Sequence, residues 1–371
     1  MSTNDPRVSF FMPGLYGGGG EDVVLKLAAG FVDRGVNVDI VVVKNEGALQ
    51  GRIPSNVNLV DLNAGRIATS LLPLLRYLRY YSPTVLVSAL TPANVIAILA
   101  CILTGKKLTT VLTEHNIKST KLGRKDLKTW VFTVAAWFTY GWANQIVTAS
   151  NRIADDLCSV VQLKREKVEV IPNPVFTEEL HRKANEEVDH PWFRSDVEVL
   201  LGVGRLTPQK DFPTLIRTVA RLRENRDVRL ILLGEGEERS HLQDLCRELG
   251  IEDHVDLHGF VDNPIKYMAH SDVFVLSSAW EGFGIVVVEA LASGVPVVST
   301  CGDEGPGEIL KDGRYGRLVP TGDDKSLSEA TLKALNNPDQ PATEKERIRR
   351  ARDFSAEAAI EKYWSIIEPY V

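Results

Sequence analysis

Two glutamates eight residues apart enclose a glycine turn in the C-terminal half of the chain. Glu281 precedes the turn Gly282-Phe283-Gly284, and Glu289 lies on the apolar run that follows it. If a helix begins after the turn, its first N–H groups lack partners within the helix and point into the space between the carboxylates. Such a helix N-terminus attracts anions, phosphate above all. Glutamates at this spacing also arise by chance, so the interpretation needs support from other residues.

Two cations earlier in the same half suit the same kind of ligand. Arg205 and Lys210 follow Gly204 at the end of an apolar run, residues 199–203, that predicts a buried strand. Ligands of open parallel sheets collect where strands end, and a planar guanidinium with a mobile ammonium suits a diphosphate. A solvated surface turn is the alternative for any such pair. The ligand interpretation is favoured because Glu281 follows a strand of the same predicted sheet.

The N-terminal half has two further features at predicted strand ends. Gly17, Gly18 and Gly19 follow a predicted strand at residues 7–12 and either bring the backbone close to a ligand or form a flexible turn. His115 follows another predicted strand and is either a functional side chain or a hydrogen-bonded structural histidine. No acidic residue ends the second strand, so the glycine run is not a dinucleotide fingerprint.

The order of the predicted elements gives the fold class. Strands alternate with helices in two series, which predicts α/β domains with parallel sheets, and a length of 371 residues favours two domains. Residues 176–196 are rich in charge and proline and predict a linker. The expected domains are residues 1–175 and 197–350. An aromatic-rich final helix lies within residues 351–371, and we expect it to pack back on the N-terminal domain.

The strands are expected at particular positions in each series. In the first they are residues 7–12, 36–43, 57–60, 84–88, 107–112, 145–148 and 168–171. In the second they are residues 199–203, 228–233, 255–258, 273–276, 295–298 and 317–319.

The composition excludes several classes of protein. Apolar residues make up 44% and charged residues 25%, which is ordinary for a globular enzyme. No apolar run reaches the roughly 18–20 residues that span a bilayer, and the first residues lack a signal-peptide pattern. Four cysteines without Cys-x-x-Cys spacing predict reduced thiols in a cytoplasmic protein.

The net charge of −6 is unevenly distributed. Residues 1–173 hold 19 Lys and Arg against 13 Asp and Glu, whereas the remainder holds 24 against 36. Basic side chains concentrate at residues 106–128 and in a Leu- and Tyr-rich helix at residues 67–80, and an apolar helix is expected at residues 127–142. Such helices suit an anionic membrane surface, or they are domain core with a solvated rim. The acidic total and the lack of a binding motif disfavour a nucleic-acid partner.

Taken together and in order, these motifs resemble family 4 of the retaining glycosyltransferases, which have the GT-B fold. The resemblance implies two doubly wound, Rossmann-like domains that face each other across a cleft. The residues that carry it are Gly204-Arg205 with Lys210, Glu281-Gly-Phe-Gly with Glu289, Asn173-Pro-Val, His258-Gly-Phe-Val261, and the glycine-rich residues 301–308.

The resemblance implies a role for each matching residue. Arg205 and Lys210 would bind the diphosphate of a nucleotide sugar and stabilise its departure, and Glu289 would hold the ribose hydroxyls. Glu281 and His115 would contact the donor sugar, which makes His115, Arg205, Lys210 and Glu281 the expected catalytic residues. Carboxylates accept from paired hydroxyls, and cations neutralise a leaving diphosphate. The other expected donor-binding residues are Gly17, Gly18, Gly19, Gly204, Phe260, Val261, Gly282, Phe283, Gly284 and Ile285.

The expected function is retaining transfer of a hexose or N-acetylhexosamine from a nucleotide sugar, UDP-linked in our prediction, to a glycan or lipid-linked acceptor. No Asp-x-Asp occurs in the sequence, so no metal or other cofactor is expected. The protein is expected in the cytoplasm, attached peripherally to the inner face of the membrane through its N-terminal domain. Two alternatives stay open: a non-catalytic sugar-nucleotide-binding or assembly protein, and a nucleotide-sugar epimerase on the same fold.

Overall fold

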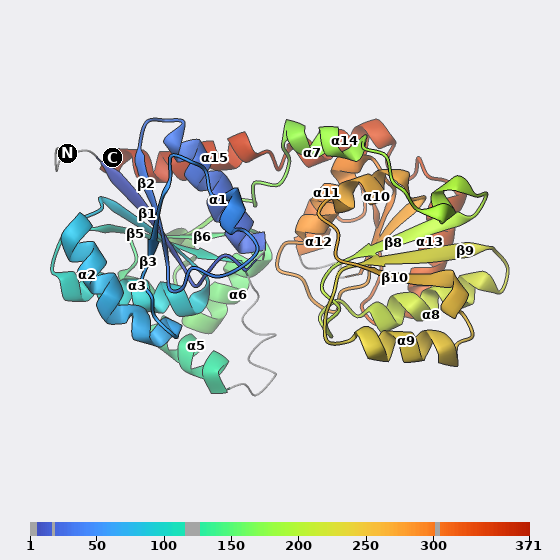
Figure 1. The fold of residues 1–371 in the computed structure, drawn as a ribbon, viewed down its shortest axis with the longest axis horizontal. Coiled ribbons are helices and arrows are strands. Elements are labelled where there is room, and N and C mark those ends of the chain that lie inside the picture. Colours follow the sequence, from blue (N-terminus) through green and yellow to red (C-terminus); the bar gives the residue numbers. More distant parts are fainter. Residues whose placement is uncertain (1–5, 17–18, 116–126, 301–304) are drawn as a thin grey trace. The chain divides into compact units, whose positions relative to one another are not determined.

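The chain folds into two α/β units (Figure 1). The computed structural model describes residues 6–16, 19–115, 127–300 and 305–371. Unit 1 comprises Met1–Pro174 with Ala356–Val371, and unit 2 comprises Val175–Ser355. Within the described ranges, every helix is too short or too polar to cross a membrane.

Unit 1 contains a seven-stranded parallel sheet with the strand order β3-β2-β1-β4-β5-β6-β7. The central strands are buried along nearly their whole length because helices cover both faces, and their sequences are accordingly almost continuous apolar runs. The strands are β1 Arg7–Met12, β2 Asn37–Val42, β3 Asn58–Asp61, β4 Val85–Ala89, β5 Thr109–Glu114, β6 Gln145–Thr148 and β7 Val168–Val170.

Strand β5 differs from its expected position by two residues at each end. It extends to Glu114 because it stays paired with β6 as far as the register position Glu114–Thr148. His115 therefore comes directly after the strand, at its carboxyl end.

The helices of unit 1 begin and end at conventional capping residues. Ser150 accepts a hydrogen bond from the backbone N–H of Ile153 at the start of α6, and Gly105 ends α3 in the left-handed conformation. The helices are α1 Gly19–Val32, α2 Leu71–Tyr81, α3 Thr91–Thr104, α5 Leu127–Thr139, α6 Asn151–Val161 and α15 Ala356–Ile367.

Unit 2 contains a six-stranded parallel sheet with the order β10-β9-β8-β11-β12-β13. Strand β12 begins at Val297 instead of the expected residue 295, because Pro296 has no N–H to donate to the neighbouring strand. The strands are β8 Glu198–Val203, β9 Val228–Leu233, β10 Val255–Gly259, β11 Val273–Leu276, β12 Val297–Ser299 and β13 Arg317–Leu318. The helices are α7 Glu178–Ala184, α8 Phe212–Arg223, α9 Arg239–Glu248, α10 Pro264–His270, α11 Ile285–Ser293, α12 Gly305–Leu310, α13 Asp324–Asn336 and α14 Glu344–Arg352.

Both sheets reverse their strand order at one point, between β1 and β4 in unit 1 and between β8 and β11 in unit 2. Loops that leave neighbouring strands there run to opposite faces of the sheet and open a crevice at the carboxyl ends. Arg205 and Lys210 follow β8, and Glu281 follows β11. These three of the expected site residues thus flank the switch point of unit 2.

The expectation of a linker at residues 176–196 is wrong in this structure. These residues belong to unit 2 and contain the helix α7, which packs against α10 and α11, and the single turn Pro191–Arg194. The apolar residues Leu180 and Ala184 are spaced by four, so they lie on one face of α7 and are buried. A seven-residue helix is too short to show a clear apolar period in so charged a sequence.

The C-terminal helix α15 lies in unit 1 and packs against α1. Ile360 and Tyr363 belong to the core of this unit, and the ring centroid of Trp364 lies 5.8 Å from that of Phe31. A Cβ added at Gly30 would come within 2.6 Å of Ile360, so this glycine lets the two helices approach closely.

Candidate functional site

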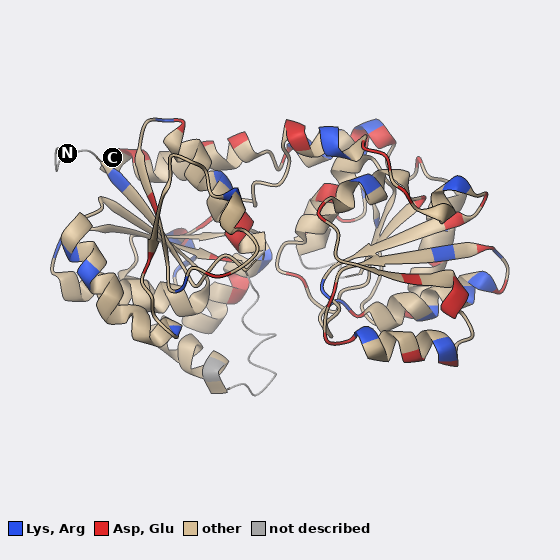
Figure 2. Ribbon diagram, viewed as in Figure 1, with Lys and Arg blue, Asp and Glu red and all other residues tan. Residues whose placement is uncertain are grey.

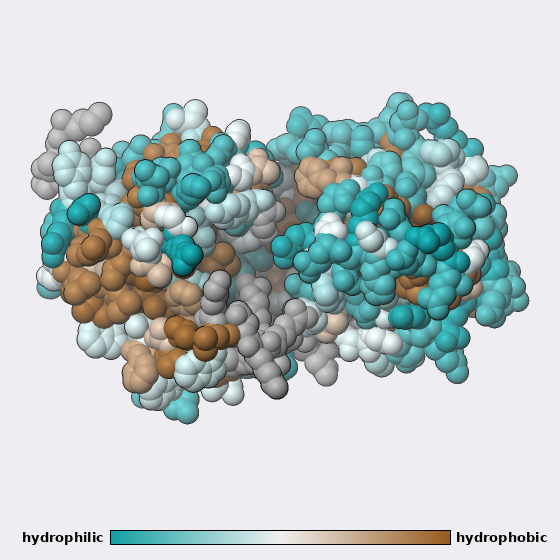
Figure 3. Space-filling view, turned by 60° about the horizontal axis from the view of Figure 1, so that its bottom comes forward, coloured by the Kyte–Doolittle hydropathy of each residue, from teal (hydrophilic) through white to brown (hydrophobic). Residues whose placement is uncertain are grey.

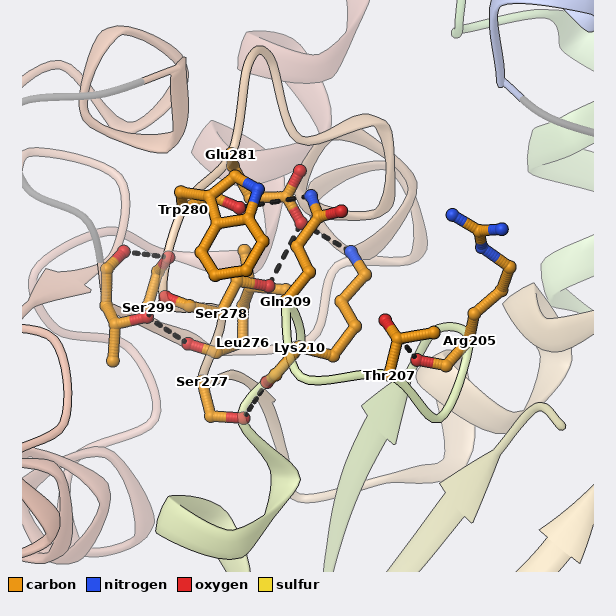
Figure 4. A network of polar contacts seen from close by, with 11 residues as sticks. Arg205, Thr207, Gln209, Lys210, Leu276, Ser277, Ser278, Trp280, Glu281 and Ser299 are labelled. Atoms are coloured by element: carbon orange, nitrogen blue, oxygen red, sulfur yellow. Dashed lines mark hydrogen bonds and ion pairs between the residues drawn. The ribbon is translucent and has the colours of Figure 1, made fainter. Parts of the chain in front are cut away.

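An ion pair joins the two loops at the switch point of unit 2 (Figure 4). The Nζ of Lys210 bonds to Oε1 of Glu281, and the two side chains are only 16% and 10% exposed. The hydroxyl of Ser278 donates to the same carboxylate oxygen at 3.0 Å. The backbone N–H of Ala279 also donates to the carbonyl of Gln209 at 2.8 Å. The loops after β8 and β11 are therefore held together by side-chain and main-chain bonds.

Arg205 is the second cation of this site and is arranged differently. Its side chain is exposed, and Figure 4 shows its guanidinium apart from the pair of Lys210 and Glu281. Among the residues that the structure describes, no carboxylate forms an ion pair with it. The five N–H donors of Arg205 are thus available to an anionic ligand.

Gly204 brings the loop of Lys210 close to the strand end. A Cβ at this position would lie 2.8 Å from Cε of Lys210, so the alkyl chain of the lysine rests on the glycine. A larger residue at position 204 would push the ammonium out of its place beside Glu281.

The turn at residues 282–284 presents backbone rather than side chains. Gly284 has φ 93° at the N-cap of α11, a left-handed conformation that favours glycine. The Phe283 side chain is buried, with its ring centroid 5.7 Å from that of Phe354, so only the main chain of Phe283 faces a ligand. Gly305 packs so tightly on the turn that an added Cβ would lie 2.4 Å from Cα of Phe283.

Helix α11 starts directly after this turn and separates the two glutamates. Ile285 is its first residue, and Glu289 lies one turn further along, half-buried. Glu281 lies in the preceding loop, where the whole residue is 8% exposed. The two carboxylates therefore have different surroundings, which allows them different partners.

Phe260 and Val261 follow β10 on the far side of β9 from the ion pair. Phe260 is 74% exposed, which is unusual for a large apolar ring in unit 2, and Val261 is half-buried. An exposed ring at a strand end suits stacking on a flat ligand group such as a base.

In unit 1 the structure brings His115 against the start of α1. A Cβ added at Gly20 would come 3.4 Å from Cδ2 of the His115 ring, and Gly19 is the first residue of α1. Both ring nitrogens of His115 are buried, and neither has a hydrogen-bond partner among the described residues. Gly17 and Gly18 lie outside the described residues, as do residues 301–304 of the expected glycine-rich loop.

Burial lowers the pKa of His115, an effect that the negative Glu114 and the nearby Asn173 side chain only partly offset. Its imidazole is therefore neutral at pH 7. One nitrogen of a neutral ring donates and the other accepts, which suits contact with a sugar hydroxyl.

Sequence reasoning missed the polar cluster behind His115. Glu114 is completely buried and accepts hydrogen bonds from Tyr140, from Thr91 at 3.1 Å and from Asn94 at 3.2 Å. Asn94 also donates to the carbonyl of Thr113 at 3.0 Å. The cluster fixes the end of β5 and hence the position of His115. The single sign of this cluster in the sequence is the acidic residue Glu114 between an apolar run and His115.

The charges in unit 2 can bind a diphosphate and a polyhydroxyl group side by side. Arg205 offers a bidentate fork, and Lys210 can exchange Glu281 for a phosphate oxygen. The carboxylate of Glu281 can then accept hydrogen bonds from sugar hydroxyls, which take the place of its ion pair.

Two parallel α/β units of seven and six strands, with cations and carboxylates at strand ends, define a GT-B fold. The crystal structure of Anabaena HepE in complex with UDP-glucose has the same fold. The TM-score is 0.83 at 21% identity, over 98% of this chain and 99% of that chain.

The chain belongs to the group 1 and family 4 glycosyltransferases. The model described as Glycosyltransferase Family 4 matches residues 17–179, and the model described as Glycosyl transferases group 1 matches residues 185–353. The family, the GT-B fold and the enzyme class expected from the sequence motifs are confirmed.

Two relatives illustrate the family at the sequence level. An uncharacterized glycosyltransferase of Methanocaldococcus jannaschii is 28% identical over 335 residues, which are 80% of this chain and 82% of the relative. A Campylobacter jejuni protein is 32% identical over 247 residues, which are 67% of this chain and 65% of the relative. Its name is N-acetylgalactosamine-N,N'-diacetylbacillosaminyl-diphospho-undecaprenol 4-alpha-N-acetylgalactosaminyltransferase.

Proposed function

We propose that this protein transfers a hexose or N-acetylhexosamine, with retention, from a UDP-sugar to a glycan or lipid-linked acceptor in cell-surface polysaccharide or glycolipid synthesis. The observation that carries the proposal is the pair of Lys210 and Glu281 beside the exposed Arg205 at the switch point of unit 2. The UDP-glucose in HepE and the diphospho-undecaprenol in the Campylobacter relative's name support the choice of donor and acceptor.

In the proposed reaction the leaving group does part of the chemistry. The bond between the anomeric carbon and the diphosphate oxygen breaks, and the acceptor hydroxyl oxygen bonds to that carbon from the same face. The departing phosphate oxygen takes the hydroxyl proton. Arg205 and Lys210 neutralise the charge that grows on the diphosphate. Glu281 holds the transferred sugar, and Glu289 holds the ribose.

The proposal is tested by incubating the purified protein with UDP-, GDP- and ADP-linked sugars and a lipid-linked acceptor, with mass spectrometry of the products. We expect transfer from a UDP-sugar, with an α-configured donor giving an α-configured product. Added chelator should leave the rate unchanged, and loss of activity that Mg²⁺ or Mn²⁺ restores would contradict metal independence. Tight donor binding without hydrolysis or transfer would favour the non-catalytic alternative.

A membrane-bound acceptor is supported by a row of exposed apolar residues on α5, here called the outer stripe. Within this helix, exposed apolar residues recur about every seven positions, which places them on one face. The opposite face, with Ala136, is buried in the unit, whereas the exposed residues show that the helix is not buried all round. The outer stripe comprises Leu127, Trp130, Val131, Trp137 and Phe138, with exposures of 71%, 57%, 49%, 45% and 65%.

Helix α2 likewise exposes large apolar side chains. Leu72 and Tyr80 are 62% and 82% exposed, and the exposed Arg76 and Arg79 lie on the same helix. Figure 3 shows apolar side chains gathered on unit 1, whereas unit 2 is mainly hydrophilic in that view. In Figure 2, α5 is nearly free of charged residues, unlike α8 and α9. Aromatic rings with flanking arginines suit the interface of an anionic bilayer.

We expect the double variant Trp137→Glu and Phe138→Glu to lose binding to phosphatidylglycerol-containing vesicles by about tenfold or more, because two exposed aromatic side chains no longer enter the interface. Co-sedimentation at low salt measures this. Leu332→Glu, at a partly exposed leucine of α13 in unit 2, is the matched control and should bind like the wild type. Wild-type protein that stays in the supernatant would refute membrane attachment.

A further inference from the structure

Residues 183–194, here called the strap segment, are hydrogen-bonded to the part of unit 2 that contains Phe260 and Val261. The amide of Asn263 donates to the carbonyl of Lys183 at 3.1 Å and to Glu186 at 2.9 Å. The Nζ of Lys266 donates to the carbonyl of Glu187 at 3.1 Å. These bonds attach the strap segment to the start of α10, just beyond Phe260 and Val261.

His190 is the innermost residue of the strap segment, 5% exposed. Its Nδ1 accepts a hydrogen bond from the backbone N–H of Trp192 at 3.3 Å, as the cap of the turn Pro191–Arg194. A ring nitrogen that accepts carries no proton, so the proton of the neutral ring is on Nε2. This Nε2–H donates to Oδ2 of Asp256 on β10 at 3.1 Å.

The same carboxylate oxygen of Asp256 also accepts a hydrogen bond from a second histidine, His258. Nδ1 of His258 lies 2.9 Å from Oδ2 of Asp256, and Nε2 of His258 lies 3.0 Å from the hydroxyl of Tyr267. Burial and the nearby negative Asp256 raise the pKa of Tyr267, which keeps its phenol protonated as the donor. One assignment of protons thus gives a donor and an acceptor to each of the four hydrogen bonds from the Trp192 N–H to Tyr267.

This series of hydrogen bonds reaches β10 close to the point where the strand leaves its sheet. The register of β10 against β9 shifts between Leu257 and Gly259, and Gly259 has φ 96°. The strand stays paired as far as Gly259, whose carbonyl accepts a hydrogen bond from the backbone N–H of Gly234 at 2.7 Å. Phe260 is the first residue beyond the strand, where the ladder no longer sets the direction of the backbone. The side-chain contacts of His258, two residues before Phe260, are thus made at the last part of the strand.

We propose that His190 is a positioning residue for nucleotide binding: through Asp256 and His258 it holds the segment Gly259–Val261 so that the Phe260 ring stacks on the donor base. This inference rests on the proposed function, because a nucleotide-sugar donor supplies the base on which the exposed Phe260 ring would stack. The strap segment is then a part of the donor site that contacts no donor atom itself.

The two histidines and the aspartate also have the composition of a metal site. Their ligand atoms lie within 4.8 Å of one another. However, a metal needs a lone pair on Nε2 of His190, and the bond from Trp192 N–H places a proton there. The hydrogen-bonded arrangement satisfies the observed contacts without an ion.

Two variants of His190 separate its two hydrogen bonds. Asparagine places an oxygen near the position of Nδ1, so His190→Asn keeps the acceptor for Trp192 N–H but does not reach Asp256. Glutamine places an amide N–H near Nε2, so His190→Gln keeps the donor to Asp256. We expect the KM for the donor of His190→Asn to rise about tenfold with kcat within about twofold, and that of His190→Gln to rise less than about threefold.

Calorimetric titration with UDP supplies the matching binding constants and separates the possible outcomes. Phe260→Ala tests the base contact itself, and His241→Ala, at an exposed histidine of α9, is the control. Weaker UDP binding by Phe260→Ala and His190→Asn, but not by His190→Gln, supports the proposal. If only Phe260→Ala binds weakly, the role of His190 is refuted and the proposed function stands. If wild-type protein binds no nucleoside diphosphate, both fail.

Thermal unfolding and metal titration complete the test. Equal melting temperatures of His190→Asn and His190→Gln, together with different UDP affinities, support positioning and exclude general destabilisation. If Zn²⁺ or Mn²⁺ binds the wild type with one-to-one stoichiometry and Asp256→Asn removes this binding, the cluster is a metal site and the positioning role is overturned.

Discussion

Replacement of Lys210 by alanine is expected to lower kcat by a factor of about 1,000, because the leaving diphosphate loses the cation that neutralises it in the transition state. The variant also leaves Glu281 without its ion-pair partner in a site where that side chain is 10% exposed. Removing one partner of a fully buried pair costs roughly 3–5 kcal/mol of folding stability. We expect a smaller loss, about 2 kcal/mol, because Lys210 keeps 16% of its side chain exposed. Steady-state kinetics and denaturant unfolding measure the two effects.

Arg205 separates the catalytic effect from the structural one. Its side chain is exposed and forms no ion pair with the described residues, so Arg205→Ala should unfold like the wild type while kcat falls about 100-fold. Arg217→Ala, at an exposed arginine of α8, is the charge-matched control and should retain full activity. Undiminished transfer by Lys210→Ala or Arg205→Ala would refute the assigned roles.

The second large effect is expected from Gly305→Ala. The new Cβ would lie 2.4 Å from Cα of Phe283 and 2.5 Å from the carbonyl oxygens of Gly282 and Phe283. All three atoms are backbone, so no side-chain rotation relieves the overlap and the turn at residues 282–284 has to move. Overpacking of this kind costs about 2 kcal/mol, which lowers the melting temperature by roughly 4–8 °C. Because the turn presents the N–H groups at the start of α11, UDP affinity should fall about tenfold as well.

Gly51→Ala is a suitable control for this variant. A Cβ at Gly51 meets no atom within 4 Å, and its φ lies outside the left-handed region. It should therefore unfold at the wild-type temperature or slightly above it, since alanine restricts the unfolded chain. A Gly305→Ala protein with wild-type melting temperature and UDP affinity would mean that the turn tolerates displacement and does not form the anion site.

Sequence alone was sufficient for the strand series and for most of the unit 2 site. Parallel strands buried on both faces are continuous apolar runs, and residues 228–233 and 273–276 were expected at the positions of β9 and β11. The positions of Arg205, Lys210 and Glu281 after strands followed from the same pattern. Two strand boundaries differ from their expected positions. Strand β5 ends at Glu114 because of its pairing with β6, and β12 begins after Pro296 because proline lacks an N–H.

Other features depended on contacts that no local pattern encodes. The pairing of Lys210 with Glu281 spans 71 positions, and that of His190 with Asp256 spans 66. Residues 176–196 were expected as a linker because their charge and proline content resembles one, yet tertiary packing makes them part of unit 2. Likewise, the composition of α5 did not determine which of its apolar side chains are buried; the core that packs against Ala136 did.

There is a physical reason why the sequence determined some of these features and the tertiary structure the others. Strand formation, turn chemistry and the position of a residue relative to a strand end are set by neighbours within a few residues, so the amino-acid order determines them directly. Which charged groups neutralise each other, which helix face is left exposed and which segment is attached to the start of α10 are set by side chains that meet only after the sheets have formed. The two glutamates and the glycine turn were evident from the sequence, but only the tertiary structure decided that Glu281 pairs with Lys210 while Glu289 lies one turn into α11.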